Sequence, residues 1–313
     1  MNNLIYRILA LSFFFFSVYT CKKTPTENTI NEKENITPKL QRVYINGDSL
    51  HYLDVGQGEP VVFVHGGLGD YRTWAGQMDT FSTNYRVIAY SRRYAYPNKQ
   101  VYVDTADYSV KPHAQDLAEL IKTLNLGPVH LVGHSWGAFT SLKATIDNPE
   151  LIKTLVLGEP PAHSLISNTK IGDSLINYII ENAFIPSDAA FKKDDEVQGI
   201  TAFIGGVMGD SLIYSKVSDE TRERWLQNTT EMRGCVKAEA IITIPHEDVS
   251  GIEIPVLVIK GDRSPLYFRK IADTVHSLLP NSRLYTLSKS SHGLQGNNPD
   301  EFNKTVLEFI NEN

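Results

Sequence analysis

Short apolar runs separated by turn residues dominate the chain from residue 41 onward. Runs rich in Val, Ile and Leu are typical of strands buried on both faces of a sheet. They lie at 60–64, 85–90, 129–132, 152–157 and 254–259, and a further strand is expected near 282–287. Two alternating segments, 42–45 and 50–55, come first and flank an Asn-Gly-Asp turn, which predicts an opening β-hairpin.

Helical periodicity fills most of the gaps between these runs. Segment 114–124 places its leucines and Ile121 on one face, and residues 138–147, 268–279 and 299–311 also have helical patterns. A hairpin followed by alternating strands and helices predicts an α/β fold. The expected sheet is mostly parallel, with helices on both faces.

The stretch 161–248 interrupts this alternation. It has helical patterns at 171–184, 196–207 and 218–232 but no run typical of a buried strand. We therefore expect an α/β core formed by residues 41–160 and 249–313, with a helical cap, residues 161–248, inserted between two of its strands. Insertions at this edge of an α/β sheet carry substrate contacts.

The first 21 residues have a different pattern. Arg7 precedes an apolar run at 8–19, which is short for a membrane span but fits a secretory signal. Cys21 and two lysines follow, so residues 1–21 resemble a bacterial lipoprotein signal, in which the cysteine is acylated. An uncleaved anchor and plain secretion are the alternatives. Residues 22–40 are polar and predict a flexible tether.

We accordingly expect an exported protein in the bacterial cell envelope, whose only membrane contact is a lipid anchor at Cys21. The net charge of −6, without a basic tract, argues against nucleic-acid partners. Cys235 is then left without an intrachain partner and is expected to be a quiet thiol. His246 lacks the second histidine of a zinc helix, and we expect neither a metal nor a cofactor.

The sequence Gly-His-Ser-Trp-Gly at 133–137 carries the clearest chemistry. It directly follows the run at 129–132 and directly precedes a helix. This strand–turn–helix context is the one that a nucleophile elbow requires, with Ser135 as the nucleophile. A side chain at Gly133 or Gly137 would collide with neighbouring backbone in so tight a turn.

A second loop, His65-Gly66-Gly67, follows the run at 60–64. We expect the backbone N–H groups of Gly67 and Trp136 to form an oxyanion hole, because rigid backbone donors need no reorganisation as charge develops. A glycine turn that only joins strand to helix is the alternative.

The base and the acid of a catalytic triad complete the set. His292 lies after the last predicted strand and before the last helix, which makes it the candidate base. Two carboxylates compete as its partner. Glu159 follows the run at 152–157, and Asp262 follows the run at 254–259. Both are expected at strand ends that face the nucleophile.

These motifs resemble those of the α/β-hydrolase superfamily. The resemblance covers residues 41–313 and points to the capped subgroup with haloperoxidase-like esterases, C–C hydrolases and prolyl-aminopeptidase-like enzymes. It implies an α/β-hydrolase fold and a Ser–acid–His triad that needs no cofactor. The superfamily usually places its acid three residues after the glycine that ends the penultimate strand, where this chain has Ser264. Asp262 is thus out of register, and we rank Glu159 ahead of it.

The expected activity is serine-dependent acyl transfer, most simply hydrolysis of a small carboxylic ester. A helical cap usually presents apolar side chains to the substrate, which favours apolar esters. Aminopeptidase or amidase activity is the alternative, and would need an acidic group in the cap, for which residues 194–196 are candidates. A non-catalytic surface binding protein on the same fold is the alternative of a different class.

Overall fold

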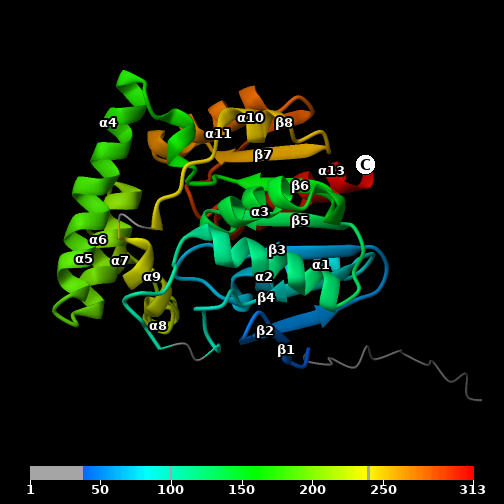
Figure 1. The fold of residues 1–313 in the computed structure, drawn as a ribbon, viewed down its shortest axis with the longest axis horizontal. Coiled ribbons are helices and arrows are strands. Elements are labelled where there is room, and N and C mark those ends of the chain that lie inside the picture. The colour runs from blue at the N-terminus through cyan, green and yellow to red at the C-terminus, as the bar shows by residue number, and fades with distance from the viewer. Residues whose placement is uncertain (1–37, 99–100, 238–239) are drawn as a thin grey trace, which may run out of the picture. The chain divides into compact units, whose positions relative to one another are not determined.

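An eight-stranded sheet forms the centre of the computed structural model, which describes residues 38–98, 101–237 and 240–313 (Figure 1). The strand order is β1-β2-β4-β3-β5-β6-β7-β8. The strands are β1 (Gln41–Ile45), β2 (Asp48–Val55), β3 (Pro60–Val64), β4 (Arg86–Tyr90), β5 (Val129–His134), β6 (Ile152–Gly158), β7 (Val256–Gly261) and β8 (Ser282–Leu287).

The sheet is mostly parallel, as the sequence predicted. β1 and β2 form the expected antiparallel hairpin, with positive φ at Asn46 and Gly47 in its turn. β2 is antiparallel to β4, and all remaining neighbours are parallel. Consequently β3, β5, β6 and β7 end at the same edge, which brings the loops after them together.

Helices cover both faces of this sheet. The core helices are α1 (Ala75–Phe81), α2 (Val110–Thr123), α3 (Trp136–Asp147), α11 (Leu266–Leu278), α12 (Leu294–Asn297) and α13 (Pro299–Asn311). Alternate strand residues point to opposite faces. Val61 and Phe63 accordingly pack with Trp74 and Phe302 in one apolar cluster, whereas Val62 belongs to the other cluster with residues of α2 and α3.

The described residues between β6 and β7 form helices joined by loops, and no strand lies among them. This segment contains η3 (His163–Ile166), α4 (Lys170–Ile179), the π-helical turn η4 (Ile180–Phe184), α5 (Ile185–Phe191), α6 (Glu196–Met208), α7 (Ile213–Lys216), α8 (Asp219–Leu226), α9 (Thr229–Cys235) and α10 (His246–Ser250). Figure 1 shows α4 to α9 gathered at one end of the sheet. The expected cap boundary at 248 falls inside α10, and the domain limits stay a prediction.

One predicted helix is wrong in detail. The pattern at 218–232 suggests a single helix, but the chain forms α8 and α9 with a break at Asn228. The Asn228 side-chain amide donates to Asp70 Oδ2 (2.9 Å) and to Arg224 O (2.8 Å), and its Oδ1 accepts from Tyr96 N (2.7 Å). Contacts with the core therefore interrupt a locally favourable helix.

The predictions for the N-terminal segment fall mainly on undescribed positions. The leader 1–21, Cys21 and the tether as far as residue 37 lie outside the described residues. Across 38–98, 101–237 and 240–313, none of the helices has the length and apolar character needed to cross a bilayer. Export and lipid anchoring stay predictions. Cys235 is buried, and burial raises the pKa of its thiol well above the ordinary value.

Candidate active site

Ser135 occupies a sharp turn between β5 and α3. Its φ of 53° and ψ of −125° are unfavourable for a residue with a side chain, a strain often found at functional sites. A Cβ on Gly137 would lie 2.2 Å from Val64 O, and one on Gly133 would lie 2.6 Å from Ala138 Cα. The flanking glycines are therefore required by close backbone approach, as the motif predicted.

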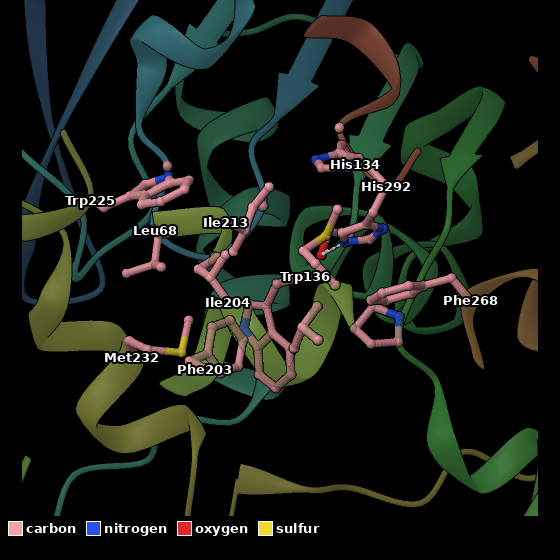
Figure 2. A pocket seen from close by; sticks show the side chains of 18 of the residues that line it. Leu68, His134, Trp136, Phe203, Ile204, Ile213, Trp225, Met232, Phe268 and His292 are labelled. Carbon is pink, nitrogen blue, oxygen red and sulfur yellow. Dashed lines mark hydrogen bonds between the residues drawn. The ribbon is translucent and has the colours of Figure 1, made fainter. Parts of the chain in front are cut away.

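The structure brings Ser135, His292 and Glu159 together in one hydrogen-bonded chain. His292 Nε2 lies 2.9 Å from Ser135 Oγ, and Nδ1 lies 2.6 Å from Glu159 Oε2 (Figure 2 shows the first contact). Glu159 is fully buried, and its other oxygen accepts a 2.9 Å hydrogen bond from Gly261 N. A carboxylate facing Nδ1 holds the proton there, which leaves Nε2 as the acceptor for the serine hydroxyl.

Asp262 lies apart from this chain. Its Oδ1 accepts a hydrogen bond from Ser290 N at 2.9 Å, which lowers the pKa of the Asp262 carboxyl, and its side chain is 40% exposed. No hydrogen bond joins Asp262 to His292 within the described chain. Ser264, at the superfamily's usual acid position, is buried, and its hydroxyl has no hydrogen-bond partner among the described residues.

Two further side chains hold His292, and sequence reasoning missed both. The Phe268 ring stacks on the imidazole with centroids 3.6 Å apart and an interplanar angle of 12°. His134 Nε2 lies 2.6 Å from the backbone oxygen of His292 and donates to it. The place of His134 in the motif was visible in the sequence, whereas nothing local linked Phe268 to His292.

The loop His65–Asp70, here called the oxyanion loop after its predicted role, packs against Ser135. A Cβ on Gly66 would lie 3.1 Å from Ser135 Cβ. No hydrogen bond from the Gly67 or Trp136 N–H to another described residue is present. Gly67 and Trp136 line the same cavity as Ser135, so both N–H groups are donors available at this site.

A cavity of about 450 Å³ opens beside the Ser135–His292 pair. Figure 2 shows apolar side chains of the cap gathered around it. The apolar side chains that the cap contributes include Ile179, Phe184, Phe203, Ile204, Val207, Met208, Ile213, Val217, Trp225 and Met232. The cap also contributes the polar residues His163, Thr221 and Arg224. None of the described residues that line the cavity is Asp or Glu. The site thus places a mostly apolar chamber next to the hydrogen-bonded chain of Ser135, His292 and Glu159, here called the relay.

Buried histidines surround the site and stay neutral. Burial lowers the pKa of His65 and of His134 to about 3, and that of His163 to about 4. In an unfolded chain these groups titrate near a pKa of about 6.5. The unfolded state therefore binds more protons than the folded state below that pH, so the stability contributed by these groups is lost as pH falls from about 6.5 towards 4.

We expect the free energy of unfolding to decrease steadily from pH 6.5 to pH 5. In the variant His163→Gln, its slope against pH should be smaller by about 1.4 kcal/mol per pH unit, the value for one proton. Urea unfolding at half-unit pH intervals measures this slope. Partly exposed His276→Gln serves as the control. An unchanged slope in His163→Gln would show that His163 does not contribute to acid lability.

Comparisons with known proteins agree with this architecture. A family model described as "alpha/beta hydrolase fold" matches residues 59–299. The chain is 26% identical over 230 residues to (E)-2-((N-methylformamido)methylene)succinate hydrolase of Acinetobacter baylyi, covering 70% of this chain and 78% of that protein. It is 26% identical over 273 residues to serine hydrolase BPHL of Homo sapiens, covering 86% and 85%.

Among solved structures, the enol-lactonase from Burkholderia xenovorans LB400 superposes with a TM-score of 0.70 at 19% identity. The match covers 87% of this chain and 100% of that one. This likeness concerns the fold alone.

Proposed function

Because this chain belongs to the alpha/beta hydrolase family, we propose that it hydrolyses small carboxylic esters through a covalent acyl intermediate on Ser135. The relay from Ser135 through His292 to Glu159 carries the proposal, with distances of 2.9 Å and 2.6 Å. A serine hydroxyl is a weak nucleophile until an oriented base removes its proton. The two relatives at 26% identity are both named as hydrolases, which supports a hydrolytic reaction.

In the acylation half-reaction, His292 Nε2 takes the proton of Ser135 Oγ as that oxygen attacks the ester carbonyl carbon. The carbonyl oxygen becomes an oxyanion, which accepts hydrogen bonds from the N–H groups of Gly67 and Trp136. His292 then gives its proton to the departing alkoxide, the ester C–O bond breaks, and the alcohol leaves. Glu159 stabilises the imidazolium that forms between these steps.

In the deacylation half-reaction, water occupies the place of the alcohol. His292 removes a proton from the water, whose oxygen attacks the acyl carbonyl. The tetrahedral intermediate collapses, and Ser135 Oγ leaves with the proton returned by His292. The carboxylic acid product dissociates, and the relay is restored.

The chamber favours an apolar ester over an N-terminal peptide. Recognition of a substrate amine requires an acidic group near it, and the cap's candidates lie elsewhere. Asp194 pairs with Arg233 at the surface, Asp195 caps α6, and Glu196 accepts a hydrogen bond from Thr229. Aminopeptidase chemistry therefore lacks its anchoring group among the described cavity residues.

The cap should set the limit on acyl size. In Ile204→Trp, the larger side chain enters the cavity. We expect kcat/KM for a p-nitrophenyl hexanoate to fall at least about 10-fold, with the acetate changed by less than about 3-fold, because pocket volume discriminates by such factors. Val197→Trp, on the exposed side of the same helix, is the control. Equal losses on both esters in Ile204→Trp would contradict a role in acyl selection.

The direct test is a substrate panel with an active-site label. Purified protein is assayed with p-nitrophenyl esters of increasing chain length and with aminoacyl amides, and is treated with a fluorophosphonate probe. We expect ester hydrolysis, weak or no amide hydrolysis, and one label per chain. Preferred amide turnover would support the amidase alternative. If the protein shows no turnover and no labelling, the result would support a non-catalytic binding protein and overturn the proposal.

A further inference from the structure

Arg92 connects the oxyanion loop to the cap. It follows β4 and is fully buried. Its Nε donates to His65 O at 3.0 Å, and its Nη2 donates to Gly66 O at 3.0 Å. The guanidinium also forms a bidentate ion pair with Glu231 of α9, with Nη2 2.8 Å from Oε2 and Nη1 bonded to Oε1. One side chain thus joins two consecutive loop carbonyls to a helix of the cap.

The second of these carbonyls belongs to the peptide group whose N–H is that of Gly67. Three donors converge on Gly66 O: Arg92 Nη2, His65 Nδ1 at 2.8 Å and Gly69 N at 3.3 Å. His65 Nε2 in turn accepts from Arg92 N at 3.0 Å, which leaves the imidazole proton on Nδ1. Because a peptide group is planar, fixing its oxygen also fixes the direction of its N–H.

The cap reaches the same loop at two other points. Met232, next to Glu231, lies so close to Gly67 that its Cε would be 2.9 Å from a Cβ at that position. At the start of α9, Asn228 donates to Asp70 at the far end of the loop. His113 Nε2 lies 3.0 Å from Glu231 Oε1 and encloses the ion pair from α2. This part of the cap is therefore fixed to the oxyanion loop.

We propose that Arg92 and Glu231 are a positioning pair, which holds the 66–67 peptide so that the Gly67 N–H meets the oxyanion formed on Ser135. The inference rests on the proposed function, because it concerns the same reaction. Neither residue lines the cavity, so both act through the loop. Donors that are already oriented stabilise developing charge without reorganisation, and loss of one such donor typically lowers kcat by about 10²–10³-fold.

The test replaces both charges at once, because removal of one partner alone would leave a buried unpaired charge. In Arg92→Met/Glu231→Leu, apolar groups fill the space. We expect cooperative unfolding to be retained, kcat to fall by about 10²-fold, KM to change by less than about 3-fold, and fluorophosphonate labelling to slow in parallel with kcat. Amide hydrogen exchange at 65–70 should accelerate, with exchange in β3 and β5 unchanged.

The matched control is Arg93→Met/Asp116→Leu. This neighbouring pair has an Nη2–Oδ1 distance of 2.6 Å, and no hydrogen bond or ion pair links it to the oxyanion loop within the described residues. Its kcat should stay within about 3-fold of the parent value. Parallel losses in the control and in the Arg92 variant would overturn the proposal, because they would indicate a general effect of losing a buried pair.

A folded Arg92→Met/Glu231→Leu protein with parental kcat, or with raised KM and unchanged kcat, would also overturn the positioning role. If that protein does not fold, the variant Arg92→Lys tests the positioning role instead. One lysine ammonium cannot bind both loop carbonyls and the Glu231 carboxylate at once. The kcat of Arg92→Lys should fall at least about 10-fold, and a parental value would overturn the proposal. A parent protein that neither hydrolyses esters nor labels would instead refute the proposed function.

Discussion

Replacing Ser135 by alanine is expected to lower kcat for ester hydrolysis by about 10⁶-fold, as for serine enzymes whose triad acts as a unit. The variant keeps the cavity, the oxyanion loop and His292, but has no oxygen to attack the carbonyl carbon. Its fold should be unchanged, because alanine retains the Cβ of a residue whose strained backbone is fixed by the flanking glycines.

The measurement is steady-state turnover of the best ester, combined with fluorophosphonate labelling and intact-protein mass. Ser291→Ala is the matched control, because that serine also lines the cavity but lies outside the relay. The control should label and turn over within about 10-fold of the parent. Undiminished labelling of Ser135→Ala would show that another residue is the nucleophile.

Glu159→Gln is expected to lower kcat by about 10⁴-fold, whereas Asp262→Asn should cost less than about 10-fold. The amide keeps the volume of the carboxylate but presents a donor as well as an acceptor to His292 Nδ1. The imidazole can then hold the wrong tautomer, with its proton directed at Ser135 Oγ, and the charge of the imidazolium is no longer balanced.

Measuring kcat of the two variants side by side decides which carboxylate is the triad acid. Both should remain folded, since Glu159 Oε1 and Asp262 Oδ1 each accept one backbone N–H that an amide oxygen can also accept. The reverse order of losses would make Asp262 the triad acid. Small and equal losses would show that neither residue orients His292.

Local sequence was sufficient for the parts of the site that are built locally. The turn around Ser135 lies between a strand and a helix that touch it directly in the chain, so its motif and context predict its geometry. The strands were predictable for a related reason: full burial on both faces requires continuous apolar runs. β3, whose residues 61–64 are all buried, accordingly has the bounds that its run indicated, and the partly exposed edge strand β8 also has its predicted bounds.

The choice of acid was not decided by sequence pattern alone. Glu159 and Asp262 both follow buried strands, and their difference lies in where the chain turns next. Glu159 has a φ of 49° and faces inward, whereas Asp262 caps the backbone at Ser290. The Arg92–Glu231 pair also escaped prediction, because 139 residues separate its members and only the packing of the cap brings them together.

Insertion of the cap between β6 and β7 bears on the order in which the molecule folds. β6 can pair with β5 early, but its pairing with β7 must close a loop of about 100 residues, and such long-range parallel contacts form slowly. Until then β6 is an unpaired edge, open to association with other chains. Glu159 meets the Gly261 N–H only across this junction. Recovery of activity during refolding would therefore report the final closure of the sheet, after most helices have already formed.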